Sequence, residues 1–456
     1  MDNEQEDNAH TITISLLASN NQPQQQKIGP NESNIRVGSF TGHHQSSISG
    51  STGFAKTCFN GLNALSGVGM LSVPYALSSG GWLSLIILLI IACSTLYTGL
   101  LIQRCMDMDS NIRSYPDIGD RAFGIRGRAI VSVLMNTELY MVATGFLILE
   151  GDNLYNLLPN MEFQIGGFTI GGRQGFVIIV SLVILPTVWL NNMSILSYIS
   201  ASGVLASIVL LCSIFWTGAF DGIGFKETGT LLNWNGIPTA VSLYAFCYCA
   251  HPVFPTLYTS MRNRRQFSKV LVLCFFLCTV IYALMAILGY LMFGSRVLSQ
   301  VTLNLPTDKI SGKVAIYTTL VNPIAKYALM VVPIVTAIEN RLISYCSKKR
   351  PFSLFIRTTL VLTTVIVALS IPLFAYLMSL VGAFLSISAS VMIPCLCYLK
   401  ISGIHRSLNF ELLVIAGILL MGVSVMITGT YTALVEIIGH FVTLVSLISN
   451  TTDSQI

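Results

Sequence analysis

The sequence predicts an all-α polytopic membrane protein with about eleven transmembrane helices, counted by the length needed to cross a bilayer. Hydrophobic residues make up 53% of the 456 residues and charged residues only 10%, whereas soluble domains carry roughly 25% charged residues. The mean hydropathy is +0.71. Apolar runs recur along the chain, and two of them contain Gly, Ser or Pro at their middles. This composition excludes an ordinary soluble domain, and we expect no nucleic-acid partner.

Residues 1–50 differ from the rest of the chain. They are rich in Gln, Asn, Ser, Gly and His and contain almost no aromatic residues. Such a segment cannot bury enough apolar surface to order itself. It also lacks the apolar core of a signal peptide. We therefore expect a disordered cytosolic tail.

Residues 51–433 form the membrane domain. Apolar runs of about 18 residues or more are counted as spans. We expect eleven spans, at 53–79, 82–103, 128–150, 175–190, 195–219, 237–260, 269–293, 315–340, 355–376, 378–399 and 410–433. Proline inside the fourth and eighth spans predicts kinks there.

A further apolar stretch, residues 434–449, carries Glu436 and His440 and is too short for a comfortable crossing. We expect a helix docked on the membrane surface, within a C-terminal tail of residues 434–456. A twelfth span is the alternative.

Basic residues predict the orientation of the spans. With the N-terminus in the cytosol, the inner loops hold sixteen Lys and Arg residues and the outer loops hold five. Because cytosolic loops are enriched in Lys and Arg, a cytosolic N-terminus is favoured. An odd number of spans then places the C-terminus and the Asn450 glycosylation sequon on the non-cytosolic side.

The first interrupted run is residues 63–76, in which Ser66, Gly67, Gly69 and Pro74 lower helix propensity near the middle of a span. A helix broken at this depth frees backbone N–H and C=O groups to hold a substrate. The half-helix beyond the break presents its positive end, which suits a carboxylate. Tight helix packing is the other role of glycine pairs in membrane helices.

The second interrupted run is residues 246–255, where Pro252 removes a backbone N–H and opens the helix one turn earlier. Phe246, Tyr248 and Phe254 could then form walls for an apolar side chain. His251 can change its charge across the pH range of an acidic compartment. A hydrogen-bonded interior histidine on a kinked helix is the competing interpretation.

Glu138 lies ten residues beyond Arg128, which places it about 15 Å into a hydrocarbon core of about 30 Å. A carboxylate near the midplane is costly unless it is paired, hydrated or protonated. We interpret Glu138 as a proton-coupling group or an anchor for an amino group, with a structural, hydrogen-bonded acid as the alternative. Lys326 is expected to extend to the membrane interface, and Glu150 and Asp152 to form an acid pair at the interface.

Other chemistries are not indicated. The cysteine pairs Cys247/Cys249 and Cys395/Cys397 are two residues apart, so they point to different faces of a helix and do not suit a metal. The sequence shows no metal cluster, Walker loop or nucleotide fingerprint. We therefore expect no enzyme activity, no metal and no cofactor beyond a proton gradient.

Two motifs carry a resemblance to a known family. The pattern Asn63-x-x-x-Gly67-x-Gly69-x-Leu71-x-x-Pro74-x-Ala76, followed by Gly81-Trp82, resembles the first helix of the amino acid/auxin permease family. The pattern Phe246-x-x-x-x-His251-Pro252-x-x-Pro255 resembles its sixth helix. Within the family, the chain is most similar to the plant and fungal vacuolar (AVT-type) amino acid transporters.

The resemblance implies a LeuT-like fold, with five helices repeated in inverted orientation and broken helices 1 and 6 around a central site. It also implies proton-driven transport of amino acids in the vacuolar membrane. The plasma membrane is the alternative location, and we expect a monomer. The substrate contacts that it implies are Asn63, Ser66, Gly67, Val68 and Gly69 in helix 1 and Phe246, Tyr248, Cys249 and His251 in helix 6.

We expect the protein to transport neutral amino acids by alternating access. The first break would bind the α-carboxylate of the substrate and the second break its α-amino group. Protonation of Glu138 or His251 would couple transport to the proton gradient. Three alternatives stay open: an amino acid sensor with little flux, a channel, and a sodium-coupled symporter. The last would need hydroxyl ligands in helix 8, where Thr336 is available but residues 328–333 offer few others.

Overall fold

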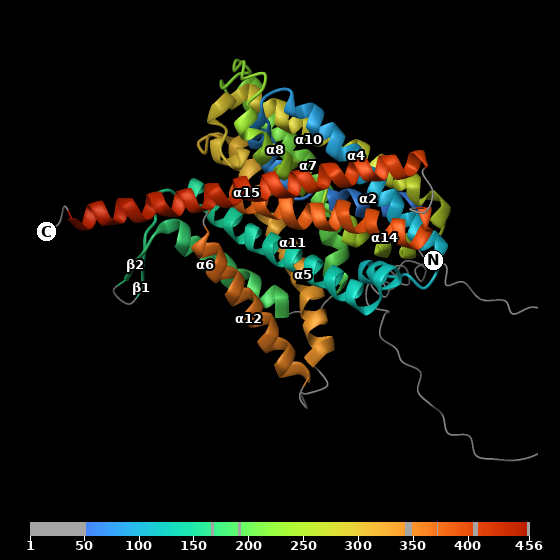
Figure 1. Ribbon diagram of the computed structural model, residues 1–456. Coiled ribbons are helices and arrows are strands. Elements are labelled where there is room, and N and C mark those ends of the chain that lie inside the picture. The colour runs from blue at the N-terminus through green and yellow to red at the C-terminus, as the bar shows by residue number, and fades with distance from the viewer. Residues whose placement is uncertain are drawn as a thin grey trace, which may run out of the picture.

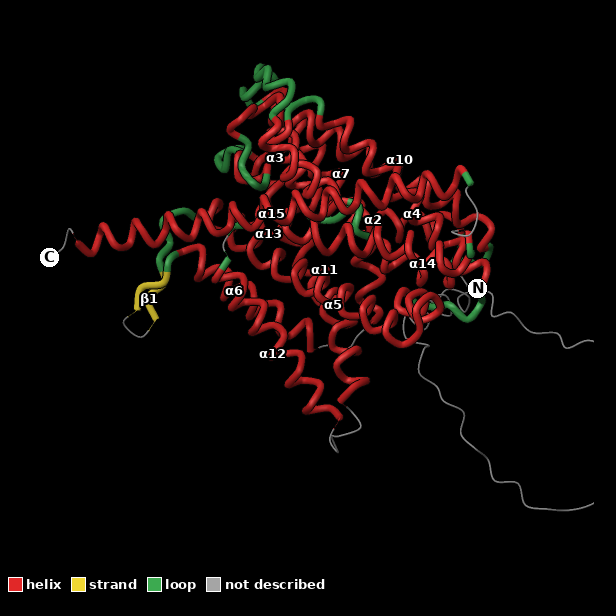
Figure 2. The backbone as a smooth tube through the Cα atoms, viewed as in Figure 1, coloured by secondary structure: helices red, strands yellow, loops and turns green. Residues whose placement is uncertain are grey.

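The structure is a computed structural model that describes residues 52–165, 168–189, 193–342, 349–371, 373–404 and 409–453. It is almost entirely helical, as Figure 1 and Figure 2 show. One short antiparallel hairpin, β1 (Phe163–Ile165) and β2 (Phe168–Ile170), projects from the helical bundle. The expected N-terminal tail, residues 1–50, lies outside the described residues.

The helices follow the order expected from the apolar runs. Their bounds are α2 (Phe54–Leu65), α3 (Gly69–Gly80), α4 (Ser84–Met108), α5 (Tyr115–Leu157), α6 (Gly172–Trp189), α7 (Met193–Phe220), α8 (Ile237–Cys247), α9 (Phe254–Ser260), α10 (Phe267–Phe293), α11 (Ile310–Leu342), α12 (Lys349–Ser370), α13 (Phe374–Leu380), α14 (Ile393–Ser402) and α15 (Phe410–Asp453).

Among the described residues, ten helical segments are long and apolar enough to cross a membrane. The first expected span is not one of them, because it is divided into α2 and α3, of 12 residues each. The expected number of eleven is reached only when α2 and α3 are counted together as one interrupted span.

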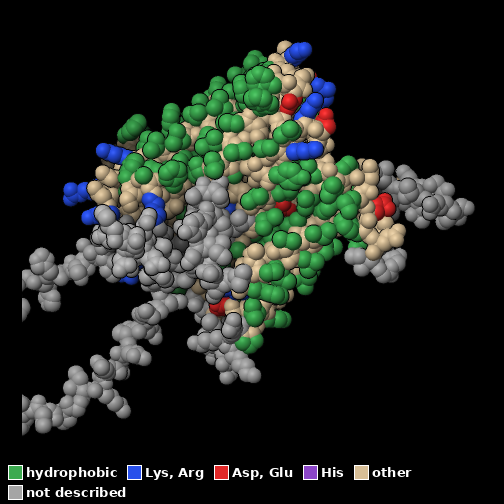
Figure 3. All heavy atoms as spheres, turned by 180° about the vertical axis from the view of Figure 1, so that it is seen from behind, with side chains coloured by type: hydrophobic (Ala, Val, Ile, Leu, Met, Phe, Trp, Pro, Cys, Tyr) green, Lys and Arg blue, Asp and Glu red, His purple; other side chains and the backbone are tan. Residues whose placement is uncertain are grey.

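The outer surface suits lipid. Large apolar side chains such as Ile86, Leu205, Phe276 and Leu413 are more than half exposed. Figure 3 shows hydrophobic side chains covering most of the visible face, with Lys and Arg gathered at its margins. This distribution is expected of a helix bundle embedded in a bilayer.

Helix α5 begins earlier than the apolar run indicates. Ser114 and Asp117 form a capping box at its start, in which the Asp117 carboxylate accepts a hydrogen bond of 2.8 Å from the Ser114 N–H. The first turns of the helix carry both charged and apolar residues. A count of apolar residues therefore places the start of this helix too late. A kink at Gly124, where φ is +67°, joins these turns to the apolar part.

The C-terminal apolar stretch is not a separate element. The docked surface helix expected at residues 434–449 is instead a continuation of α15, which runs without interruption from Phe410 to Asp453. In Figure 1 its C-terminal end extends beyond the other helices. The stretch contains no proline, and Gly439 alone does not end the helix.

The tenth span departs from regular α-helix geometry. Two π-helical segments, η7 (Val381–Ser386) and η8 (Ser388–Met392), connect α13 to α14. Segment η7 packs against α8 and α5, and η8 packs against α4. Since π-helical turns are uncommon and often mark functional sites, this span lies at a position of interest next to the second interrupted helix.

Candidate functional site

The first break lies between α2 and α3 and consists of Ser66, Gly67 and Val68. The Gly67 N–H donates to the Leu65 carbonyl at 2.8 Å, a local turn that ends the α-helical ladder. Pro74 lies inside α3, two turns away. The interruption is therefore caused by the Ser-Gly sequence, since both residues have low helix propensity, rather than by the proline.

The second break lies between α8 and α9. It consists of Tyr248, Cys249 and Ala250, followed by a single 3₁₀ turn, η2 (His251–Val253). Proline residues at the starts of η2 and α9 supply no N–H to the preceding turn. The helix therefore opens where the sequence predicts.

The two breaks face each other, as expected. A Cβ atom added at Gly69 would lie 2.8 Å from Cys247 Sγ and 3.2 Å from Cys247 Cα. The start of α3 therefore approaches the end of α8 more closely than any residue larger than glycine allows. Gly69 therefore allows the close packing of these two helices.

Tyr282 of α10 connects the two breaks. Its hydroxyl lies within hydrogen-bonding distance of the Leu65 carbonyl, at the end of α2, and of the Cys247 carbonyl, at the end of α8, the latter at 3.2 Å. The Tyr282 side chain is fully buried. Sequence reasoning missed this residue, although a tyrosine in the middle of an apolar span is a signal because its hydroxyl needs a partner there.

Lys326 occupies a position opposite to our expectation. Its side chain is 5% exposed, and its ammonium donates to the Ser66 carbonyl at 3.0 Å and to the Asn63 carbonyl at 3.4 Å. The prediction that it extends to the membrane interface is wrong. The partners that hold it in the interior are carbonyls released by the break in another helix, which the local sequence of α11 does not show.

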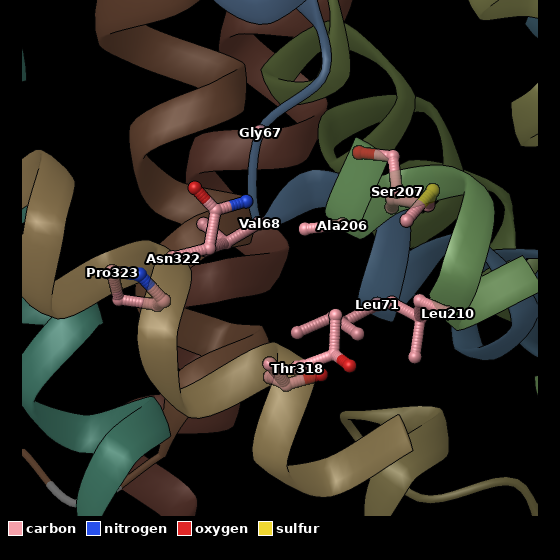
Figure 4. A pocket seen from close by; sticks show the side chains of 11 residues that line it. Gly67, Val68, Leu71, Ala206, Ser207, Leu210, Thr318, Asn322 and Pro323 are labelled. Atoms are coloured by element: carbon pink, nitrogen blue, oxygen red, sulfur yellow. The ribbon is translucent and has the colours of Figure 1, made fainter. Parts of the chain in front are cut away.

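A small pocket lies beside the first break. It is formed by Gly67 and Val68 with Ser207 of α7 and Asn322 and Pro323 of α11, among others. Figure 4 shows the side chains of the three elements surrounding it. Its volume is about 20 Å³, enough for a water molecule, which needs roughly 10–15 Å³. An amino acid would require the pocket to widen.

The predicted helix 1 residues take different positions around this pocket. Gly67 and Val68 line it. Ser66 is buried and its hydroxyl is hydrogen-bonded to the Ser207 hydroxyl. Asn63 is 8% exposed, and among the described residues its Oδ1 atom has no hydrogen-bond partner. Gly69 contacts α8 instead.

The predicted helix 6 residues do not line the pocket, whose described lining comes from α2–α3, α7 and α11. Phe246 lies under Gly69, 3.4 Å from the position of an added Cβ. Tyr248 is hydrogen-bonded to Thr279 at 2.8 Å and stacked on Phe275. These residues form a packed wall of aromatic side chains behind the second break.

His251 faces α4. Its Nε2 atom lies 2.9 Å from the Thr98 hydroxyl and 2.9 Å from the Thr95 carbonyl, and the side chain is fully buried. Because a carbonyl oxygen only accepts hydrogen bonds, the Nε2 atom must carry a proton to donate to Thr95. The ring links the second break to α4.

Glu138 lies beside the second break. It is 3% exposed, and one carboxylate oxygen accepts a hydrogen bond of 2.6 Å from Ser386 in η7. Cys249, in the second break, lies near both of these side chains. Glu138, Ser386 and Cys249 therefore join α5, the π-helical segment and the second break in one cluster.

The expected interface acid pair is not a pair. Glu150 is fully buried, and neither carboxylate oxygen has a hydrogen-bond partner among the described residues. Asp152 is partly exposed, forms an ion pair with Arg173 and accepts a hydrogen bond of 2.9 Å from Gln300. The expectation is wrong for Glu150, because the loop containing Gln300 and the neighbouring helices cover this end of α5.

Comparisons with known proteins agree with this architecture. The chain is 63% identical over 393 residues to the amino acid transporter AVT1J of Arabidopsis thaliana, covering 86% of this chain and 93% of that protein. It is 43% identical to AVT1B of the same plant, over 87% of this chain and 73% of that protein. The vesicular GABA transporter of Caenorhabditis elegans is 27% identical, over 84% and 79%.

A solved structure supports the fold. The Na⁺-coupled sialic acid symporter in its substrate-bound outward-open state matches with a TM-score of 0.52 at 11% identity, covering 83% of this chain and 89% of that chain. The LeuT-like fold implied by the family resemblance is confirmed. Residues 50–435 match the family described as transmembrane amino acid transporter protein. The chain therefore belongs to the family of transmembrane amino acid transporters.

Proposed function

We propose that the protein is a secondary active transporter of neutral amino acids that works by alternating access and is driven by protons. The observation that carries the proposal is the pair of interrupted helices that face each other beside a small pocket. Discontinuous helices of this kind form the substrate sites of secondary transporters. Membership of the family supports amino acids as the substrate class.

The two breaks offer complementary partners for an amino acid. The start of α3 lies at the positive end of that helix, which suits an α-carboxylate. The Met70 and Leu71 N–H groups donate to the Gly67 and Val68 carbonyls at 3.3 and 3.0 Å, so they would have to leave these carbonyls to bind the substrate. The last carbonyls of α8, including that of Cys247, lie at a negative helix end and suit an α-amino group. The unpartnered Asn63 Oδ1 atom beside the first break is a further acceptor.

The pocket favours substrates without a charged side chain. None of the described residues that line it is charged, and a charged group in a low-dielectric site is costly without a partner. Lys326 already donates to backbone carbonyls, and Glu138, which accepts a hydrogen bond from Ser386, is not among the described lining residues. A neutral amino acid fits such a pocket, because its side chain needs no charged partner from the protein.

Glu138 is our proposed proton-coupling residue. A buried carboxyl group that accepts a single hydrogen bond from Ser386 can exist in either protonation state, and the neighbouring Cys249 belongs to the second break. Protonation would change the charge next to the segment that must move between inward and outward states. His251, which contacts α4 from the same break, is the second candidate.

The test is uptake of a mixed labelled pool of neutral amino acids into proteoliposomes, with and without an imposed pH gradient. We expect the gradient to stimulate uptake by the unmodified chain. In Glu138→Gln, gradient-driven uptake should fall about 100-fold or more, the low end of what a positioned proton-transfer group contributes. The matched control is Glu162→Gln, which removes an exposed carboxylate outside the bundle.

Other results would redirect the proposal. Uptake that does not respond to the gradient contradicts proton coupling. Gradient-driven uptake that persists in Glu138→Gln moves the role to His251, to be tested by His251→Gln. Binding of amino acids without flux identifies a sensor instead of a transporter.

We propose that the protein works as a monomer in the vacuolar membrane, with its N-terminus in the cytosol. Its similarity to the AVT1 transporters and the excess of Lys and Arg in the loops on one side support this placement. A fluorescent fusion that marks the plasma membrane instead would contradict it.

A further inference from the structure

We propose that the Lys326 ammonium fills a cation site at the first break, so that the chain carries its own tethered cation where a diffusible one could otherwise bind. This inference rests on the proposed transport function and concerns the position of a single side chain. Lys326 belongs to α11, whereas both of its partners belong to the end of α2 and the break after it.

The partners of Lys326 form a site for a positive charge. The carbonyls of Asn63 and Ser66 lie at the C-terminal end of α2, where backbone C=O groups lack partners within the helix and the dipole is negative. Backbone carbonyl oxygens at a helix end coordinate Na⁺ or H⁺ in secondary transporters with interrupted helices. The ammonium, with three N–H donors, satisfies the same oxygens.

The surroundings are shaped for this side chain. A Cβ atom added at Gly203 of α7 would lie 3.5 Å from Lys326 Cε and 2.0 Å from Asn63 Oδ1. Any larger residue at 203 would therefore collide with Asn63 of α2 and narrow the space for the lysine. The lysine itself is 5% exposed, so water does not replace these partners.

Among the described residues, no carboxylate pairs with the Lys326 ammonium. Within the described part of the chain, none of the ion pairs involves Lys326. Burying a charge is expensive unless it is hydrogen-bonded or paired. The negative end of α2 is therefore the compensating charge, which is the arrangement expected of a bound cation rather than of a structural salt bridge.

The Lys326 ammonium lies close to the residues that line the pocket. Asn322 and Pro323, which line the pocket, lie about one turn before Lys326 on α11. Gly67, on the opposite wall, follows Ser66 directly. A rearrangement that separates the first break from α11 must break the two hydrogen bonds of the ammonium. The lysine thus holds α2 and α11 together without sodium.

The experiment measures exchange of amino acids across proteoliposomes that contain the full chain. The vesicles are loaded with unlabelled amino acids, labelled ones are added outside, and no pH or ion gradient is imposed. The rate is compared in choline, sodium and lithium salts. For the unmodified chain we expect the three rates to agree.

Removing the side chain should create a sodium site. In Lys326→Ala, exchange in choline should fall about tenfold or more, the loss expected when a charged hydrogen-bonding partner leaves buried carbonyls unsatisfied. Sodium or lithium should restore much of the rate, because the ion can occupy the vacated space. Radioactive sodium should bind the purified variant and not the unmodified chain.

Two further variants separate charge from volume. Lys326→Met keeps the length of the side chain but not its charge, so exchange should fall and sodium should not restore it, because the side chain fills the space. Lys313→Ala is the matched control, since Lys313 is exposed on the same helix and should behave like the unmodified chain.

Each outcome decides the proposal. Exchange by Lys326→Met at the unmodified rate overturns it, and this variant decides even if the alanine variant does not fold. A folded Lys326→Ala that neither binds sodium nor responds to it also overturns it. A failure of exchange by the unmodified chain instead refutes the proposed transport function, while sodium binding by the purified alanine variant would still support the cation site.

Discussion

Two glycines of the first break, only two residues apart, have different surroundings. A Cβ atom added at Gly69 would contact Cys247 Sγ at 2.8 Å, whereas one at Gly67 would meet nothing closer than the Leu65 carbonyl at 4.0 Å. Gly69 is therefore needed for helix packing. A side chain would fit at Gly67, so close packing does not explain this glycine. Gly67 instead favours the interruption of the helix, because glycine has low helix propensity.

Alanine at these two positions should separate stability from transport. Gly69→Ala should lower the free energy of unfolding by about 1–3 kcal/mol, since the methyl group overpacks against the end of α8. Gly67→Ala should fold normally but favour a continuous helix by about 1 kcal/mol, raising the KM of exchange several-fold. Thermal unfolding in detergent and exchange kinetics measure the two effects. Equal losses of thermal stability in both variants would contradict this distinction.

Residues whose partners lie in distant segments could not be predicted from the sequence. The midplane depth of Glu138 followed from counting along one helix, and the residue is indeed buried. Lys326 could not be placed, because its acceptors lie more than 250 positions earlier in the chain. Glu150 was misplaced because an apolar count does not reveal that another segment covers the end of α5.

At the scale of elements, the two interrupted helices act as one unit because Tyr282 contacts the ends of α2 and α8. Its ring also packs edge-on against Tyr248, with centroids 5.6 Å apart. Both contacts fix the orientation of the breaks relative to α10. Substrate binding should therefore depend on this tyrosine although it does not line the pocket.

Tyr282→Phe should raise the KM of exchange about tenfold, because an unsatisfied buried carbonyl costs about 1–3 kcal/mol and the two breaks are no longer held in one arrangement. The control is Tyr290→Phe, the same change on the same helix. Tyr290 accepts a hydrogen bond of 2.7 Å from the Thr230 N–H in the loop before α8, so its loss should reduce thermal stability without changing KM. A Tyr282→Phe variant with an unmodified KM would show that the breaks are positioned by packing alone.

The existence of the two breaks was predictable, whereas the reason for each was only partly so. Pro252 and Pro255 mark the second break directly. In the first, Pro74 stands inside α3, and the weak propensities of Ser66 and Gly67 decide where the helix ends. Proline is tolerated within membrane helices, so its position alone does not locate an interruption.

At the scale of the whole molecule, the fold is recognisable although sequence identity to the solved symporter is 11%. The apolar runs predicted the order of the spans, because the bilayer imposes a minimum length on every one of them. The runs did not predict the extension of α15 to Asp453 or the early start of α5. Both extensions depend on capping and continuity of the backbone, which hydropathy does not measure.

The orientation can be tested with cysteines introduced at exposed positions on opposite sides. In intact vacuoles, a membrane-impermeant maleimide should label Arg265→Cys from the cytosol and should reach Lys309→Cys only after permeabilisation, since Lys and Arg favour the cytosolic side. The unsubstituted chain is the control, because Cys93 and Cys212 are also exposed. The opposite labelling pattern would invert the topology.

The hydroxyl of Tyr282 has a single proton for two carbonyls, so it can complete only one hydrogen bond at a time. If the end of α2 moves away, the hydroxyl can still donate its hydrogen bond to the Cys247 carbonyl. If the end of α8 moves away, it can still donate to the Leu65 carbonyl. The same hydroxyl therefore keeps a hydrogen-bond acceptor whichever of the two helix ends moves away from α10.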